Sequence, residues 1–248
     1  MKNRFLVIIA LSIVGLSTYS IGLITGFYNF FPAPQLIDLK NHIENKRLSA
    51  QSNFEVIDTS KKNMLILGDS ISLGYTPYLQ QMLSGTYDVY RIKRNTRHTG
   101  FGIRLLNEYF ETQKFNCDIV TFNFGLWDIA YVLKAFGDDG FQLSTPNEYS
   151  KNLQEITSSL KKNCRNVIFI LTTPVPTNEI NRTNDDVILY NNIASEIMAT
   201  NDVHIIDLYQ FAKNNKFVTN DIHFTENQSL LIAKFIVTNL QSILPTNE

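Results

Sequence analysis

The stretch MLILGDSISLGYTP, Met64 to Pro77, begins as a short apolar run and turns polar at Gly68. A brief apolar run that ends in glycine and small polar residues is typical of a buried strand. Thr76 and Pro77 then match a helix start, with threonine as the N-cap and proline in the first helical position. The stretch therefore predicts a buried strand, a turn and then a helix.

Four more apolar runs of strand length follow along the chain: YDVYRI (87–92), DIVTFNFG (118–125), NVIFILTT (166–173) and VHIIDL (203–208). Most are separated by segments whose apolar residues recur at helical spacing, namely 78–82, 103–110, 149–160 and 187–198. Buried strands that alternate with helices are typical of a parallel sheet covered on both faces. We therefore expect an α/β protein with a flavodoxin-like three-layer α/β/α fold around a central, mostly parallel five-stranded sheet. Ligands bind such sheets at the carboxyl ends of the strands.

The composition limits the functions that the chain can have. Its 248 residues, 44% of them hydrophobic, are enough for one sizeable core and predict one globular domain. The 22 basic and 23 acidic side chains give a net charge of −1, so no charge excess draws the chain to nucleic acid. Four scattered histidines and two cysteines show no metal-ligand spacing such as CxxC or HExxH, and we predict neither a metal nor a cofactor.

The N-terminal segment has the composition of a membrane anchor. Lys2 and Arg4 precede an uncharged run over residues 5–31, which exceeds the roughly 20 residues that a spanning helix needs. A cleaved signal peptide has a shorter apolar core and a small-residue cleavage site, and no convincing site is present. We therefore predict one uncleaved transmembrane helix with a cytoplasmic N-terminus, and secretion after signal cleavage is the alternative. The expected division is an anchor (1–31), a polar stalk (32–60) and a globular domain (61–248).

Ser70 stands at the end of the first predicted strand, on the edge where ligands bind. There its hydroxyl would lie beside backbone N–H groups of the following turn, which suits a nucleophile with a built-in oxyanion donor. A single serine after Gly-Asp is more often only a helix cap. A nucleophilic role therefore requires a base nearby.

A candidate base lies at the last strand–helix junction. Thr225 and Gln228 form a capping-box pattern that opens the final helix, which places His223 in the loop just before that helix. Asn220 and Asp221 stand immediately upstream and offer an amide or a carboxylate acceptor that can orient the imidazole. A lone loop histidine is more often an ordinary surface residue, but this one shares the expected functional edge with the serine.

From about residue 63 to residue 243 the chain resembles the SGNH (GDSL) hydrolase family. The family's motif blocks have counterparts, in order and at predicted strand ends, in GDSI (68–71), NTRHTG (95–100), NFGLWD (123–128) and NDIHFT (220–225). The resemblance implies that Ser70 is the nucleophile, that His223 is the base and that Gly100 lends a backbone N–H to the oxyanion hole. One subgroup of the family has a GLHD-type third block, and this chain has GLWD there. The stretches TTPVP (172–176) and YN (190–191) also resemble that subgroup.

The block that carries His223 departs from the family spacing. The family places its aspartate three residues before the histidine, where this chain has Asn220, whereas Asp221 stands two residues before it. We expect Asp221 to orient the imidazole because a carboxylate stabilises the imidazolium better than an amide does. Asn220 is the alternative acceptor.

The third block departs at Trp127, the only tryptophan of the chain. It occupies the place of the family's oxyanion-hole asparagine, whose side-chain amide donates to the developing negative charge. The indole Nε1–H is also a donor, and only a donor. The expected oxyanion hole therefore comprises N–H groups of Ser70, Gly100 and Trp127. In the alternative, Trp127 only packs, and either catalysis is crippled or Asn123 takes over as the donor.

Basic side chains gather around the second block, at Arg91, Lys93, Arg94 and Arg97. Such charges usually form a solvated face. Because arginine pairs well with carboxylate or sulfate, Arg94 and Arg97 are also candidate contacts for an anionic group of the substrate.

Cys117 and Cys164 each stand just before a predicted strand, the third and the fourth in order. These two strands are neighbours in a flavodoxin-like sheet, so the cysteines would face each other at its amino-terminal edge. Their Cα atoms could then lie within the range of about 4.4–6.8 Å that a disulfide requires. A compartment outside the cytoplasm would permit the bond, and two free buried thiols are the alternative.

Together these features predict acyl transfer, in which Ser70 attacks an ester carbonyl and His223 takes and returns the proton. Placement outside the cytoplasm favours an acylated glycan, or else a lipid or a small ester, as the substrate, and acetyl is the first candidate for the acyl group. We therefore expect a membrane-anchored serine esterase. An O-acyltransferase with the same nucleophile and a catalytically weak glycan-binding or assembly protein are the alternatives. The sequence indicates no oligomeric state.

Overall fold

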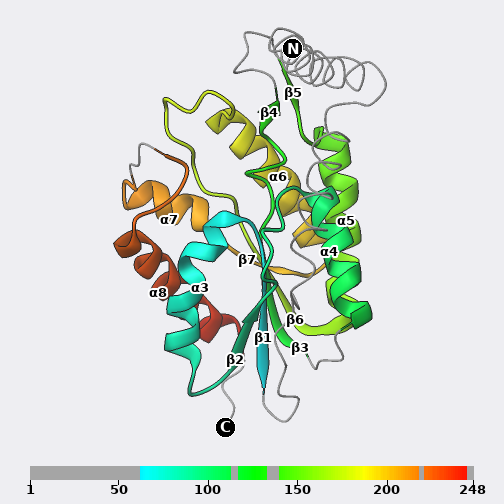
Figure 1. Cartoon of the computed structure of the whole chain (residues 1–248), viewed down its shortest axis with the longest axis vertical. Helices are drawn as coiled ribbons and strands as arrows, with labels where there is room; N and C mark the ends of the chain where they lie inside the picture. Colours follow the sequence, from blue (N-terminus) through cyan, green and yellow to red (C-terminus); the bar gives the residue numbers. More distant parts are fainter. Residues whose placement is uncertain (1–61, 113–116, 133–139, 218–220, 245–248) are drawn as a thin grey trace, which may run out of the picture. The chain divides into compact units, whose positions relative to one another are not determined.

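The computed structural model describes residues 62–112, 117–132, 140–217 and 221–244 (Figure 1). The predicted anchor and stalk lie outside these residues. Among the helices that are described, none is both long enough and apolar enough to cross a membrane.

The centre of the fold is one parallel sheet of five strands. Its members are β1 (Asn63–Leu67), β2 (Asp88–Arg91), β3 (Cys117–Phe122), β6 (Cys164–Ile170) and β7 (His204–Ile206). Their order in the sheet is β2-β1-β3-β6-β7, and every neighbouring pair is parallel. All residues of β1 and β3 are buried, as expected of central strands covered on both faces. The predicted five-stranded parallel sheet is confirmed.

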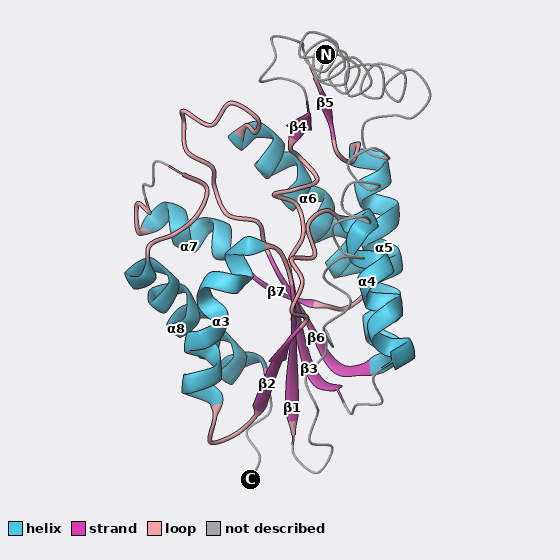
Figure 2. Ribbon diagram, viewed as in Figure 1, coloured by secondary structure: helices cyan, strands magenta, loops and turns pink. Residues whose placement is uncertain are grey.

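Within the residues that the structure describes, six helices cover the two faces of the sheet. They are α3 (Ser70–Leu83), α4 (Thr99–Thr112), α5 (Pro146–Asn163), α6 (Asn184–Thr200), α7 (Leu208–Asn214) and α8 (Glu226–Ile243). Helices α3, α7 and α8 lie on one side and α4, α5 and α6 on the other (Figure 1; Figure 2). A separate two-stranded hairpin, β4 (Tyr131–Val132) with β5 (Phe141–Gln142), follows β3. The three-layer arrangement is as predicted.

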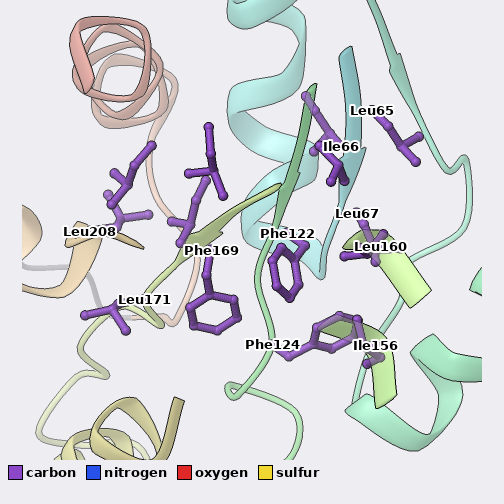
Figure 3. Packing of buried hydrophobic residues seen from close by; sticks show 14 of the residues in the cluster. Leu65, Ile66, Leu67, Phe122, Phe124, Ile156, Leu160, Phe169, Leu171 and Leu208 are labelled. Atoms are coloured by element: carbon purple, nitrogen blue, oxygen red, sulfur yellow. The ribbon is translucent and has the colours of Figure 1, made fainter. Parts of the chain in front are cut away.

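The core is built from the apolar side chains of the strands and of the helices packed on them. Figure 3 shows Phe122 and Phe169, whose rings meet edge to face with centroids 4.9 Å apart, together with Phe124 just beyond β3. Such an edge-to-face arrangement is one that aromatic pairs favour. A Cβ atom at Gly102 would lie 2.4 Å from the Phe124 ring, so this position in α4 has room for glycine only.

The predicted start of the first helix was wrong. Helix α3 begins at Ser70 rather than at Thr76, because the Asp69 carboxylate caps it by accepting from the Ile71 N–H at 2.9 Å. Aspartate is among the strongest N-cap residues. Pro77 lies inside the helix on its exposed side. It has no N–H to donate to the backbone carbonyl one turn earlier, and on this side water can form that hydrogen bond instead.

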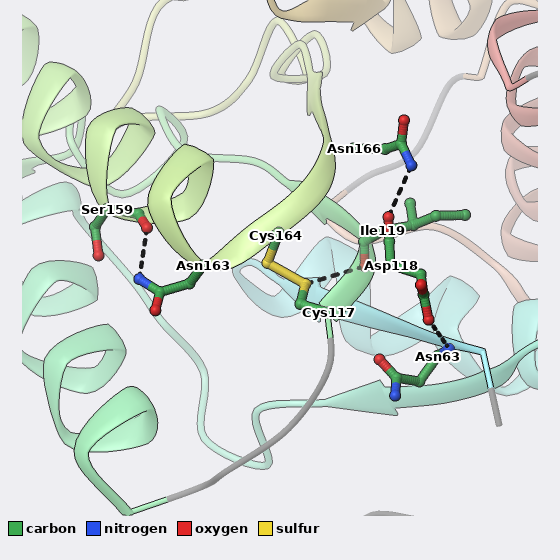
Figure 4. The surroundings of a disulfide bond; sticks show 8 residues. All are labelled: Asn63, Cys117, Asp118, Ile119, Ser159, Asn163, Cys164 and Asn166. Atoms are coloured by element: carbon green, nitrogen blue, oxygen red, sulfur yellow. Dashed lines mark hydrogen bonds between the residues drawn. A yellow bond between two sulfur atoms is a disulfide. The ribbon is translucent and has the colours of Figure 1, made fainter. Parts of the chain in front are cut away.

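A disulfide joins Cys117 and Cys164, the first paired residues of β3 and β6 (Figure 4). Their Cα atoms lie 4.5 Å apart. The bond therefore closes the amino-terminal edge of the sheet, at the opposite ends of these strands from the edge that carries the candidate site.

We expect loss of this disulfide to lower the free energy of unfolding by about 2–4 kcal/mol, because the cysteines stand 47 positions apart in the sequence and the bond restricts the unfolded state. Urea unfolding of the Cys117→Ala/Cys164→Ala variant against the wild type measures the difference. Titration of unfolded, unreduced wild-type protein should find no reactive thiol; two thiols per chain would exclude the bond.

Candidate active site

Ser70 is the first residue of α3, directly after the turn that follows β1. In this position its hydroxyl lies at the N-terminus of a helix, where backbone N–H groups lack intrahelical acceptors and the helix dipole favours negative charge. Gly68 makes the tight turn possible, because a Cβ atom there would lie 2.0 Å from the side-chain oxygen of Asn123.

The side chain next to the nucleophile, Asp69, is buried. Burial raises the pKa of its carboxyl group, while hydrogen bonds from the Asn123 side chain and the Ile71 N–H and the charges of Arg91 and Arg182 act in the opposite direction. These partners suit an ionised carboxylate that fixes the turn. Asn123 thus uses one of its two amide N–H groups for this structural contact, and its role as an alternative oxyanion donor stays a prediction.

Arg91 holds the same turn from β2. Its guanidinium donates to the carbonyl oxygens of Gly68 at 2.9 Å and of Asp69 at 3.1 Å, and to the Ser72 hydroxyl. Burial lowers the pKa of Arg91 to about 10, which leaves the side chain charged at neutral pH. The arginine that begins the predicted basic cluster therefore supports the nucleophile turn from inside the protein.

His223 meets the nucleophile from the other end of the domain sequence. Its Nε2 lies 2.9 Å from Ser70 Oγ, and its Nδ1 lies 3.1 Å from Asp221 Oδ2. The hydrogen bond with His223 lowers the pKa of the Asp221 carboxyl, so it remains an acceptor. The structure thus brings together Ser70, His223 and Asp221, and Asn220 lies outside the described residues.

The loop that carries His223 is fixed by its neighbours rather than by the charged groups, since the His223 and Asp221 side chains are 50% and 70% exposed. The following residue, Phe224, packs edge-on against Phe217, with ring centroids 5.7 Å apart. Phe217 contacts Phe211 of α7, and Phe211 stacks on Phe235 of α8 with centroids 4.1 Å apart. Beyond Phe224, the Thr225–Gln228 capping box that opens α8 is present as predicted.

The second and third motif blocks meet at a buried carboxylate. Asp128 Oδ1 accepts from the Thr99 N–H at 2.9 Å, the Thr99 hydroxyl at 2.6 Å and the Ser144 hydroxyl at 2.7 Å. Burial raises the pKa of Asp128, and nearby His98 and these hydrogen bonds oppose that shift. This contact fixes the first turn of α4, which contains Gly100. Because Gly100 is the second residue of the helix, its N–H has no intrahelical acceptor.

Trp127 lies in the turn directly before Asp128 and is partly buried. Its Nε1 atom is buried, and no residue that the structure describes accepts from it. A buried donor without an acceptor is costly, and such a group needs an explanation. Together with the N–H groups of Ser70 and Gly100, the indole is a candidate donor to a substrate oxygen.

The two arginines expected to contact a substrate anion are engaged by the protein in different ways. Arg94 forms an ion pair with Glu108 at 3.0 Å, so its charge is already matched. The guanidinium of Arg97 lies over the rings of Phe101 and Trp127, at 5.4 Å and 5.7 Å from their centroids. An anion contact for either residue stays a prediction.

Sequence reasoning missed Arg182, in the loop between β6 and α6. Its Nε donates to the Leu126 carbonyl at 2.6 Å, and Glu179 lies 3.4 Å from its Nη1. It therefore holds the turn that presents Trp127, and its charge also acts on Asp69 and Asp221. No motif marks this residue in the sequence, because its partner Leu126 is 56 positions away.

Comparison with known proteins adds to this geometry. The profile of the GDSL-like lipase/acylhydrolase family matches residues 66–227, more than half of the chain. The chain therefore belongs to this family and is an ester hydrolase of the SGNH type. A search of curated protein sequences found no match.

Several solved structures share the fold. A lipase/acylhydrolase from Enterococcus faecalis is similar with a TM-score of 0.61 and 18% identity, over 75% of this chain and 99% of that one. An acetyl xylan esterase from Geobacillus stearothermophilus gives 0.56 and 16%, over 72% and 94%. A carbohydrate acetylesterase from Sinorhizobium meliloti gives 0.57 and 12%, over 74% and 100%. At these identities the likeness is one of fold.

If Ser70 and His223 act as one catalytic unit, removing either should cost about as much ester turnover as removing both, because each group is useless without the other. Turnover of an aryl acetate by Ser70→Ala, His223→Ala and the double variant tests this. Losses that multiply in the double variant would show that the two side chains act independently.

The hydrogen bond between Asp221 and His223 predicts that Asp221→Ala lowers kcat much more than Asn220→Ala does, since only the carboxylate stabilises the imidazolium. Circular dichroism should show both variants folded, because Asp221 is exposed. A larger loss in Asn220→Ala would instead assign the orienting role to the amide at the usual family position.

Proposed function

We propose that the chain is a membrane-anchored esterase on the outer side of the cytoplasmic membrane, where it removes acetyl groups from an acylated glycan. The observation that carries its catalytic part is the hydrogen-bonded series Ser70 Oγ, His223 Nε2 and Nδ1, Asp221 Oδ2. The series lies at the carboxyl edge of the sheet, where ligands bind this kind of fold.

The mechanism follows from this series. Ser70 Oγ attacks the ester carbonyl carbon while its proton passes to His223 Nε2, and Asp221 stabilises the imidazolium. The N–H groups of Ser70, Gly100 and Trp127 donate to the oxyanion that forms. The intermediate collapses as His223 protonates the leaving alkoxide, and the glycan leaves as an alcohol. Water, deprotonated by His223, then attacks the acetyl-serine and releases acetate and Ser70.

The exposure of the site supports a polymeric substrate. His223 and Asp221 are 50% and 70% exposed, so an ester on a large molecule can reach Ser70 without entering a tunnel. Two of the proteins that share the fold are described as an acetyl xylan esterase and a carbohydrate acetylesterase. The anchor is supported by the uncharged run over residues 5–31 after Lys2 and Arg4.

Membrane fractions of cells that express the full chain should release acetate from acetylated xylan oligosaccharides and hydrolyse 4-nitrophenyl acetate faster than the palmitate ester. The matched Ser70→Ala variant should lose both activities. Preference for palmitate would assign a lipase, and transfer of acetyl to an added sugar would assign a transferase. Activity found in the soluble fraction alone would contradict the anchor.

A further inference from the structure

Four side chains, one of them the proposed oxyanion donor Trp127, are linked by contacts between cations and aromatic rings. The Arg97 guanidinium lies over the ring of Trp127 and over the ring of Phe101, at 5.7 Å and 5.4 Å from their centroids. The guanidinium of Arg104 lies over the Phe101 ring at 5.3 Å. We call Trp127, Arg97, Phe101 and Arg104 the cation–π stack. Each of these distances is within the range of about 6 Å for attraction between a cation and a ring face.

The stack has a rigid base. Phe101 is only 4% exposed and belongs to the first turn of α4, which Asp128 fixes through Thr99. Arg97 thus links the indole to the helix that carries Gly100, the other proposed oxyanion donor outside the nucleophile turn.

The backbone of Arg97 is held in an unusual conformation. Its φ angle is 52°, in the left-handed region that residues with a side chain seldom adopt. The Asn95 side chain supports this conformation by accepting from the Arg97 N–H at 2.9 Å, and the Thr96 N–H donates to the Gly68 carbonyl at 3.1 Å. Backbone outliers of this kind cluster at functional sites. Here the outlier sits in the segment that brings the guanidinium to the indole face.

We propose that Arg97 is a positioning residue for the oxyanion hole: it fixes the ring of Trp127 and strengthens its Nε1–H as a donor. The role rests on the proposed function, because it acts through the donation from Trp127. An indole has a single N–H on one edge, so the orientation of the ring decides where it can donate. A cation over the ring face withdraws electron density from the indole, and a more acidic N–H bonds better to a developing negative charge.

This role assigns the arginine to catalysis rather than to ground-state binding. An Nε1–H with no acceptor among the described residues gains its partner only when a substrate oxygen arrives. It gains most when that oxygen becomes charged in the transition state, and such an interaction raises kcat rather than lowering KM.

Fluorescence tests the contact without any substrate, because Trp127 is the only tryptophan of the chain. The full-length protein in detergent is compared with Arg97→Gln and with the control Lys93→Gln, which removes a charge from an exposed position of the same segment. We expect Arg97→Gln to shift the emission of Trp127 and to increase its quenching by acrylamide, while Lys93→Gln leaves both unchanged. An unchanged signal in Arg97→Gln would overturn the proposed contact.

Kinetics with 4-nitrophenyl acetate, a neutral ester, test the catalytic role. Loss of one oxyanion donor typically lowers turnover by about 10²–10³, so Trp127→Phe should fall in that range. Arg97→Gln should lower kcat by roughly tenfold or more with little change in KM, and should cause no further loss when added to Trp127→Phe. An equal loss in both backgrounds would overturn the proposal, as would an effect confined to the KM of esters that carry a carboxylate.

The outcomes also separate this inference from the proposed function. If the wild type shows no Ser70-dependent hydrolysis, the esterase assignment fails, and the catalytic role of Arg97 fails with it. If hydrolysis depends on Ser70 but Trp127→Phe retains full activity, only the role of the indole and of Arg97 is overturned.

Discussion

Three consecutive backbone carbonyls at the end of β1 hold the site together. The Leu67 carbonyl accepts from the Asn123 N–H, which begins the third motif segment, at 3.1 Å. The Gly68 carbonyl accepts from Thr96 of the second segment and from Arg91, which also donates to the Asp69 carbonyl. Together the three carbonyls tie the nucleophile turn to β2, to the second motif segment and to the third. The parallel pairing of β1 with β2 and β3 makes this possible, because it brings their carboxyl ends to one edge.

Two buried carboxylates accept hydrogen bonds from backbone N–H groups in the first turns of the two helices that face the site. Asp69 caps α3 through the Ile71 N–H, and Asp128 accepts from the N–H of Thr99, the first residue of α4. Burial raises the pKa of both carboxyl groups, and in both cases hydrogen bonds oppose that shift. These bonds fix the N-terminal turns that contain Ser70 and Gly100. The remaining N–H groups of the two turns are available to a substrate oxygen.

The sequence was informative where local pattern and structure coincide. Apolar runs bounded by glycine or small polar residues located the strands, and the order of motif segments located Ser70 and His223. The helix start at Thr76 was wrong because capping preference and proline position are local rules, which did not register the stronger cap at Asp69. The role of Arg91 and the contact of Arg182 with Leu126 could not be predicted from the sequence, because each is a contact between segments that only folding brings together. The stack of Arg97 on Trp127 joins positions 30 residues apart and leaves no periodic trace.

The row of phenylalanines behind His223 has a consequence for the medium in which the site can work. The hydrogen bond of His223 with Asp221 is exposed to solvent, where dissolved salt screens the field of the carboxylate over about 10 Å at 0.1 M. Stacked and edge-on phenylalanine rings carry no formal charge, so salt does not screen the contacts of Phe224, Phe217, Phe211 and Phe235. The loop that carries the imidazole is thus held by contacts that the screening of charge does not weaken.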